Sequence, residues 1–362
     1  MIFKKHEKKN NMLLLIITAL LLMFIQYGLK SKDEKIKTKY YKEMIIAAKK
    51  MKIFSEEIKK EKIKIGIQID KSLDINETGL IGEEWSGITT TLGSLESKRT
   101  STDPDFAALM VKLFKENNLK KGDSIAVNLS SSFPALNLAF LAAADTIGLN
   151  AVIVNSVGAS TYGANLENFT YLDMENLLYS KGLLKNKSIA YSLGGEYDTG
   201  KNLDETAVKN IKERNTKYGL HFFYNEDLNA NINERYEFYK SKGNIKAFIN
   251  IGGNLLSFGN ASDIIINSNV LLEENLNIKD GLIGKFLTEK IPVYHFLNLK
   301  GITTNFGMFF DSYPMHEIGI SSIYFEENSN FWNYMIITIF LIFIFKIIFN
   351  EKTLSFKFSK KK

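Results

Sequence analysis

The 362-residue sequence has no cysteine, and only three of its 46 basic residues are arginine. The absence of cysteine excludes a disulfide scaffold, a thiol nucleophile and any zinc site with cysteine ligands. The sequence also lacks a P-loop, and no G-x-G-x-x-G follows a predicted strand, so nothing supports nucleotide binding by these routes or ATP-driven ligation. Hydrophobic residues make up 45% of the chain, which is typical of a protein with a buried core and excludes wholesale disorder.

The positive charge lies at the two ends of the chain. Residues 1–30 contain five Lys and one Glu, and residues 331–362 contain six Lys and one Glu. The middle, residues 31–330, holds 35 basic and 38 acidic residues and is therefore net acidic. The overall charge of +6 thus gives no support for nucleic-acid binding, and we expect no nucleic-acid partner.

Two apolar runs adjoin these basic ends. Residues 12–29 carry no charge, and residues 331–349 carry one, Lys346, near the end of the run. About 20 apolar residues cross a bilayer as a helix, and short basic flanks stay in the cytoplasm. We therefore predict a cell-membrane protein with two transmembrane helices, both termini in the cytoplasm and the main domain outside the cell membrane.

Each run has an alternative interpretation. Residues 12–29 resemble a cleaved signal peptide, but Gln26, Tyr27 and Gly28 stand where small cleavage-site residues belong. The alternative for the second run is a buried core helix, but Trp332 and Tyr334 at its edge fit a membrane interface better. The predicted segments are a cytoplasmic tail at 1–11, spans at 12–29 and 331–349, a membrane-proximal helical stalk at 30–62, an extracytoplasmic domain at 63–330 and a basic tail at 350–362.

Strand-like and helix-like segments alternate through the predicted domain. This order predicts βαβ units and an α/β fold with a mostly parallel sheet flanked by helices. The predicted strands are 63–69, 124–129, 151–155, 188–193, 245–251 and 291–296. The predicted helices are 104–117, 134–147, 175–181, 204–218, 231–242 and 281–290.

Ligands of such folds bind beyond the carboxyl ends of the strands. Here those ends are polar and glycine-rich, so we expect their loops to share one rim. The loops are 128–134, 155–163, 194–198 and 252–254, the last containing Gly252, Gly253 and Asn254.

The segment 80–105 is the densest in hydroxyl groups: nine of the seventeen residues from Ser86 to Thr102 are Ser or Thr. Hydroxyls, an Arg fork and a helix N-terminus together suit a carboxylate or a phosphate. The alternative is a surface loop whose hydroxyls cap turns. The candidate ligand residues here are Thr89, Thr90, Thr91, Lys98, Arg99, Thr100 and Ser101. For Arg99, we expect replacement by Lys to weaken glutamate binding and to change stability little, unless the residue pairs internally with Glu83, Glu84 or Asp103.

A second candidate site follows the strand at 124–129. Ser130, Ser131 and Ser132 stand at a strand-to-helix turn, where an α/β hydrolase holds its nucleophile, or where the hydroxyls cap a helix and bind an anion. The motif G-x-S-x-G is absent, which argues against a triad. For such a triad, Ser131 or Ser132 is the weak nucleophile candidate, with His295 or His316 as base and Asp263 or Asp311 as acid.

The histidines show no metal-binding pattern. His316 and Glu317 with Asp311 form only a weak ligand set, and H-E-x-x-H does not occur. We expect neither a metal nor another cofactor.

Three runs, GLIGEEWSGITTTLGSLESKRTSTDPDFAAL, SSSFPALNLAFLAAAD and NIGGN, resemble the poly-gamma-glutamate system protein family. The resemblance covers roughly residues 80–310. It implies a membrane-anchored protein that acts beside the poly-gamma-glutamate synthesis machinery, at the capsule or cell surface. It implies no catalytic residue.

Two functions therefore stand open. The first is a non-catalytic accessory role in synthesis or export, binding the anionic polymer or a synthase subunit. The second is a serine-dependent hydrolase or transferase acting on the amide bonds of the polymer. The sequence favours the first, because it shows no coherent triad, metal set or nucleotide motif. Whether the protein is an enzyme stays open.

Overall fold

The computed structural model describes residues 35–259, 267–272 and 278–326, with isolated positions at 18, 21–22, 337 and 339–341. The chain divides into two units, residues 38–324 and the two ends that flank them. In the unit formed by the ends, strand β1 (Ile36–Lys37) pairs antiparallel with β9 (Phe325–Glu326).

The membrane spans predicted at 12–29 and 331–349 lie outside the described residues, apart from those isolated positions, as do both predicted tails. Among the residues that are described, no helix combines the length and the hydropathy needed to cross a bilayer.

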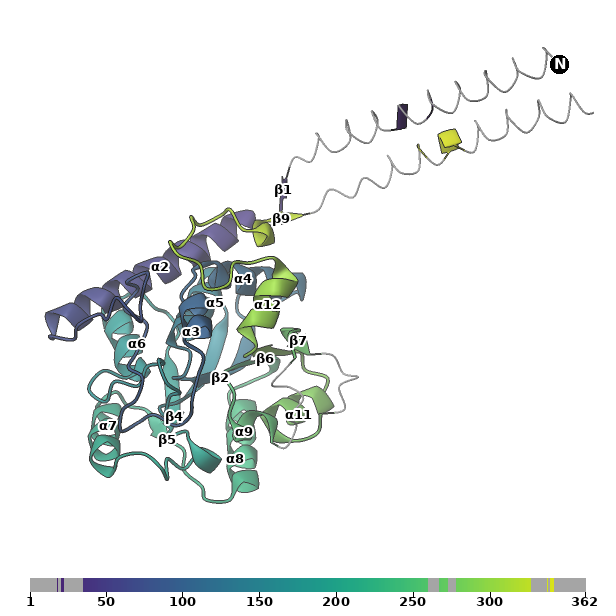
Figure 1. The fold of residues 1–362 in the computed structure, drawn as a ribbon. Helices are drawn as coiled ribbons and strands as arrows, with labels where there is room; N and C mark the ends of the chain where they lie inside the picture. The colour runs from purple at the N-terminus through teal and green to yellow at the C-terminus, as the bar shows by residue number, and fades with distance from the viewer. Residues whose placement is uncertain are drawn as a thin grey trace, which may run out of the picture. The chain divides into compact units, whose positions relative to one another are not determined.

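A seven-stranded sheet forms the centre of the unit at residues 38–324 (Figure 1). Its order is β5-β4-β3-β2-β6-β8-β7, and every neighbouring pair is parallel except β7 and β8. The predicted α/β fold with a mostly parallel sheet is thus confirmed. The strands are β2 (Ser124–Ser130), β3 (Asn150–Ser156), β4 (Ser188–Ser192), β5 (His221–Phe222), β6 (Ile245–Ile251), β7 (Leu271–Leu272) and β8 (Val293–Phe296).

The direction of winding reverses between β2 and β6. Strands β3, β4 and β5 follow in order on one side of β2, and β6 and β8 lie on the other. The carboxyl ends of β2 and β6 therefore form the topological switch point, where ligands bind in open α/β sheets. Gly252, just after β6, has φ +92°, and a Cβ there would lie 2.6 Å from Cβ of Ser130.

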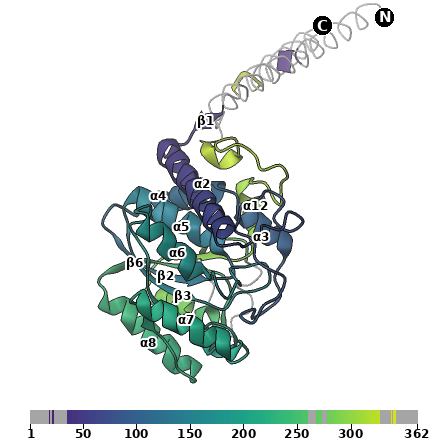
Figure 2. The ribbon, with the colours of Figure 1, turned by 90° about the vertical axis from the view of Figure 1, so that its left-hand side faces the viewer.

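One face of the sheet is covered by helices α4 (Asp105–Glu116) and α5 (Pro134–Ile147). The ring of Phe114 in α4 packs edge-on against Tyr294 of β8 and Phe140 of α5. All but one residue of α5 are buried, and its alanines let α2 and α4 pack closely beside it. Helix α6 (Tyr171–Ser180) contacts α2 as well (Figure 2).

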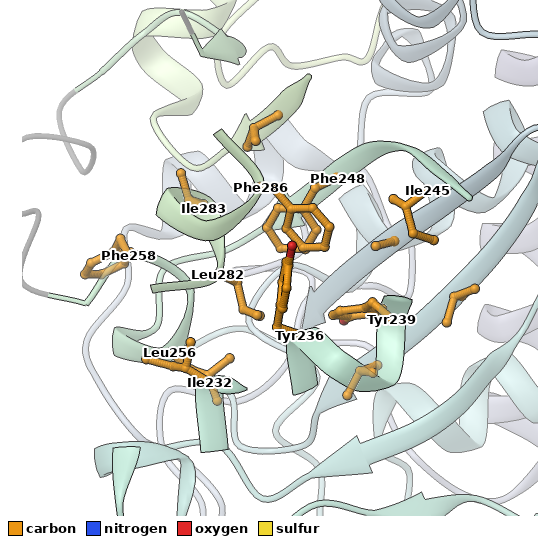
Figure 3. Packing of buried hydrophobic residues seen from close by; sticks show 14 of the residues in the cluster. Ile232, Tyr236, Tyr239, Ile245, Phe248, Leu256, Phe258, Leu282, Ile283 and Phe286 are labelled. Atoms are coloured by element: carbon orange, nitrogen blue, oxygen red, sulfur yellow. The ribbon is translucent and has the colours of Figure 1, made fainter. Parts of the chain in front are cut away.

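The opposite face carries an aromatic core (Figure 3). Phe248 of β6 stacks on Phe286 with ring centroids 4.4 Å apart, and Tyr236 meets Phe286 edge-on at 5.2 Å. These residues bring α8 (Leu228–Ser241) and α11 (Gly281–Thr288) onto the sheet beside α9 (Leu255–Phe258). The remaining elements are α3 (Leu95–Ser101), α7 (Glu205–Lys217), α12 (Leu299–Phe306) and the 3-10 turns η1 (Glu196–Asp198) and η2 (Ser322–Tyr324).

The predicted stalk is part of the α/β unit. Helix α2 (Tyr41–Lys64) buries seven side chains, among them Met44, Met51 and Phe54, and it contacts α4, α5 and α6. The predicted boundary between residues 62 and 63 therefore falls inside a packed helix. The strand predicted at 63–69 is wrong: Ile63 and Lys64 end α2, and residues 65–69 form a turn and an extended segment without strand pairing.

Candidate functional site

A pocket of about 430 Å³ opens at the switch point. Helix α3, the loops that follow β2, β3 and β6, and the connection from β8 into α12 supply its walls. Helices α3 and α12 lie beside each other in both ribbon views and in their contacts (Figures 1 and 2). The lining residues are Thr91, Leu92, Gly93, Ser94, Ser97, Lys98, Ser132, Phe133, Ser160, Gly253, Phe258, Leu297, Asn298, Leu299 and Lys300.

Lys98 is the most deeply buried cation of this pocket, with 2% of its surface exposed. Its Nζ atom contacts the carbonyl oxygen of Ser132, lies 2.7 Å from Oγ of Ser160 and sits 3.8 Å above the ring of Phe133. Among the described residues, no carboxylate forms an ion pair with it. Burial therefore lowers the pKa of Lys98 from 10.5 to about 7, so that much of the amine is neutral near neutral pH.

Backbone contacts fix Ser160 on both sides. Its own N–H donates to Oγ of Ser132 at 3.0 Å, and the neighbouring Ala159 and Thr161 hydrogen-bond to the 88–91 strand-like segment. Gly93 also lies against this serine. A Cβ at Gly93 would be 3.0 Å from Oγ of Ser160 and 3.1 Å from Cε of Lys98. The hydroxyl and the amine are therefore held together with little room for a larger neighbour at 93.

Two lysines line the pocket, although residues 31–330 are net acidic. Lys98 lies at its base, and Lys300, at the start of α12, is exposed and also lines it. None of the described residues lining the pocket is Asp or Glu. The hydroxyls of Thr91, Ser94 and Ser97 add neutral hydrogen-bonding groups. This lining suits a carboxylate-bearing ligand.

The structure brings the predicted rim together. Thr90 N–H donates to the carbonyl of Ala159 at 2.8 Å, Gly158 N–H to that of Leu193 at 2.7 Å, and Lys98 reaches the loop after β2. Of the candidate ligand residues, Thr91, Lys98, Ser132 and Gly253 line the pocket. The other candidates do not line it: Thr89, Thr90, Arg99, Thr100, Ser101, Ser130, Ser131, Gly252 and Asn254.

Most hydroxyls of the predicted anion segment are bonded within the chain. Thr100, Ser101 and Thr102 donate to backbone carbonyls three or four residues earlier in or beside α3. Thr89 Oγ1 accepts from the Ser86 N–H and from Asn165 Nδ2. The turn-capping interpretation therefore describes these residues. At the start of the helix that begins near Pro104, Asp103 Oδ1 accepts from the Asp105 N–H at 2.9 Å, so this N–H is also bonded within the chain.

Arg99 forms an internal ion pair. Its Nε and Nη2 atoms each lie 2.6 Å from an oxygen of Asp311, and both side chains are mostly buried. A carboxylate ligand would have to displace Asp311 from the guanidinium fork. The structure thus points away from Arg99 as a ligand residue, and its partner is none of the three acids expected from the sequence.

The structure does not bring the predicted serine and histidine candidates together. Ser131 Oγ donates to Asn155 Oδ1 at 3.1 Å, and Ser132 Oγ accepts from the Ser160 N–H. His295 Nδ1 lies 2.9 Å from Asn250 Nδ2, and burial lowers the pKa of His295 to about 4, which keeps it neutral. Asp311 is held by Arg99, and Asp263 lies outside the described residues.

His295 belongs to a buried polar network beneath the rim. Asn250 joins it to Asn128 and Ser257, and Arg235, which is fully buried, donates to Asn128 Oδ1 at 3.1 Å. Arg235 also pairs with Asp198 at 2.7 Å. This network ties β2, β6 and β8 to the turn after β4, and so supports the loops of the rim.

His316 lies in a second cluster, at the start of α4. Its Nε2 is 3.0 Å from Asp105 Oδ2 and 3.5 Å from Asp103 Oδ2. The ligand atoms of the three residues all lie within 4.8 Å of one another, a spacing that a metal ion can use. Burial, reinforced by the charge of Asp105, raises the pKa of Asp103 to about 7. Burial alone would lower the pKa of His316, but the two carboxylates outweigh it and raise that pKa.

The loop 155–163 lies on the rim, as predicted. Ser160, Phe133 and Lys300 also line the pocket, although none of them is a candidate from the sequence. The only local signal for Ser160 is its place in the polar loop after β3. No family model matches the chain, and no curated protein or solved structure matches it either.

Proposed function

We propose that the α/β unit binds an acidic, glutamate-like polymer in the pocket beside Lys98, as a membrane-anchored, extracytoplasmic accessory protein of poly-gamma-glutamate synthesis or export. One observation carries this proposal. The pocket at the switch point is lined by two lysines and several hydroxyls, without a lining carboxylate among the described residues, although residues 31–330 are net acidic.

Two further features support the proposal. The resemblance to the poly-gamma-glutamate system proteins includes α3 and the loop after β2, the two segments that contribute Lys98, Ser132 and Phe133 to the pocket. The ends of the unit also lie together, since the Thr38 N–H donates to the Tyr324 carbonyl at 3.0 Å. Adjacent ends suit a domain whose two flanking segments both enter one membrane.

The test measures binding of γ-linked glutamate oligomers to the purified full-length chain at low salt. Lys300→Glu replaces attraction by repulsion at the mouth of the pocket, so we expect affinity to fall about tenfold, which corresponds to about 1.4 kcal/mol. Lys246→Glu is the matched control, because Lys246 is exposed near the amino end of β6, away from the pocket.

An equal loss of affinity in the two variants would show that only net charge matters, and would refute the pocket as the binding site. Equal affinity for a neutral glutamine polymer would refute the carboxylate chemistry. If the oligomers do not bind while a synthase subunit does, the occupant is the subunit. In cells, deletion of the gene should change the amount or chain length of the surface polymer.

A further inference from the structure

The contact between Lys98 and Ser160 is more than an anion site requires. A binding site for carboxylates gains most from a charged ammonium, yet this amine is enclosed by a carbonyl, a hydroxyl and an aromatic ring. Because the amine is also buried away from water, which disfavours the charged form, it loses its proton readily and can act as a base. A neutral lysine within hydrogen-bond reach of a serine hydroxyl is the arrangement that activates the serine in Ser–Lys enzymes.

We propose that Ser160 is a nucleophile and Lys98 its general base, so that the pocket cleaves or transfers an amide bond of an acidic polymer. This inference rests on the proposed function for its substrate class, but the pair itself stands on geometry. The two side chains are 2.7 Å apart, both line the pocket, and both are positioned by bonded backbone.

Rigid neighbours hold both groups in place. Lys98 lies on α3, whose first turn is capped by Ser94 Oγ accepting from the Ser97 N–H at 3.1 Å. Ser160 lies between backbone contacts that join residues 159 and 161 to the segment 88–91. Such positioning reduces the entropy that the reaction would otherwise lose.

The reaction balances without a cofactor. Ser160 Oγ attacks the carbonyl carbon of the amide while its proton passes to Lys98 Nζ. The carbon–nitrogen bond then breaks, and the leaving amine takes that proton from Lys98. Water next attacks the acyl ester on Ser160, giving a carboxylic acid and regenerating the serine hydroxyl by way of Lys98. If an amine of a second chain attacks instead, the same ester yields transfer.

The side chain of Lys300 can bind a carboxylate of an acidic substrate and so orient that substrate towards Ser160. Lys300 is exposed at the mouth of the pocket, whereas Lys98 and Ser160 lie at its base. A carboxylate of the polymer can meet Lys300 while the neighbouring amide reaches Ser160. Phe133 and Phe258 supply apolar contacts for the methylene groups of a glutamyl side chain.

The test treats the full-length chain with a fluorophosphonate, a probe that bonds to activated serines, and locates the adduct by mass spectrometry. We expect one adduct on Ser160, with a labelling rate that rises as pH passes from 6 to 8. Ser160→Ala should abolish labelling, and Lys98→Met should slow it at least 100-fold. Ser131→Ala is the control, because the Ser131 hydroxyl is bonded to Asn155 and does not line the pocket.

Several outcomes would overturn the inference: no adduct on the folded wild type, an adduct on Ser132 instead, or a Ser160 adduct whose rate is independent of pH and of Lys98. The pH profile of the wild type keeps the test decisive even if Lys98→Met fails to fold. Binding of γ-linked glutamate oligomers to the wild type is measured in parallel. Binding without labelling refutes the serine pair alone, and labelling without binding refutes the substrate class alone.

Discussion

Arg99 and Asp311 form a bidentate ion pair, although they are 212 positions apart in the sequence. The pair joins the end of α3 to the segment after α12, and the Asp311 N–H also donates to Thr100 Oγ1 at 2.9 Å. Because α3 carries Lys98, the pair braces the helix that positions the buried amine. Arg99 therefore supports the pocket from outside it.

The first prediction concerns this pair. Arg99→Lys keeps the charge but loses the two parallel hydrogen bonds, so we expect the free energy of unfolding to fall by about 1–3 kcal/mol. Affinity for γ-linked glutamate oligomers should stay within about twofold of wild type. Thermal melts and binding measurements on the same samples check both parts. An unchanged melting temperature with a tenfold loss of affinity would restore Arg99 as a ligand residue.

Asp105 provides the second prediction. Its side chain accepts hydrogen bonds from Tyr324 at 2.5 Å and Ser321 at 2.6 Å and lies 3.0 Å from His316 Nε2, so one buried carboxylate holds the segment 316–324. Asp105→Ala leaves these groups without their acceptor, and we expect the free energy of unfolding to fall by on the order of 3 kcal/mol. Hydrogen exchange should accelerate in residues 316–324 before the rest of the unit.

The control for Asp105 is Asp70→Ala, which removes an exposed carboxylate bonded within its own turn to Ser72. Asp70→Ala should lower the free energy of unfolding by less than about 1 kcal/mol. A similar loss in both variants, or exchange that accelerates uniformly, would contradict the role given to Asp105.

The sequence predicted the sheet well because its signals are local. Strands β2, β3 and β6 are short, mostly apolar segments, and α5 begins at Pro134 as an alanine-rich helix. Each of these predictions falls within two residues of the element found. The alternation of apolar and polar residues at 63–69 wrongly predicted a strand. The helical spacing of buried residues in α2 continues through Ile58 and Lys62, and the helix ends at Lys64. Helix α3 was missed because Ser and Thr are poor helix formers and its cap, Ser94, stands among many hydroxyls.

The site was harder to predict than the fold, because its contacts join distant residues. Lys98 and Ser160 are 62 positions apart in the sequence, and no motif around either residue predicts that the two side chains meet. The rule that ligands bind at strand carboxyl ends placed the correct loops on one rim. It could not say which of their many hydroxyls would meet an amine, since this depends on how α3 packs over the loops.

Glu175 gives a prediction for the pH dependence of stability. Burial raises the pKa of Glu175 from 4.5 to about 7, although the Ser188 N–H and hydroxyl donate to it. Because the folded state binds a proton that the unfolded state has released, its contribution to stability is full below about pH 4.5 and is lost as pH rises towards 7. The associated slope approaches about 1.4 kcal/mol per pH unit.

Glu175→Gln should therefore flatten the fall in stability between pH 5 and pH 7. Denaturant melts at several pH values measure this slope, and Glu116→Gln, an exposed change on α4, serves as the control. A wild-type slope that survives Glu175→Gln would mean that Glu175 is already ionised in the folded protein at pH 5.

The last prediction concerns topology, and the absence of native cysteine makes it simple to test. If both termini are cytoplasmic and the α/β unit is outside, a membrane-impermeant maleimide should label Lys246→Cys in intact cells, because Lys246 is exposed on the unit. It should label Lys4→Cys and Lys361→Cys only after the cells are permeabilised. The wild type is an unlabelled background in every condition. Labelling of either tail in intact cells, or protection of residue 246, would contradict the arrangement. Protection of residue 246 would place the pocket in the cytoplasm, where a surface polymer could no longer be its ligand.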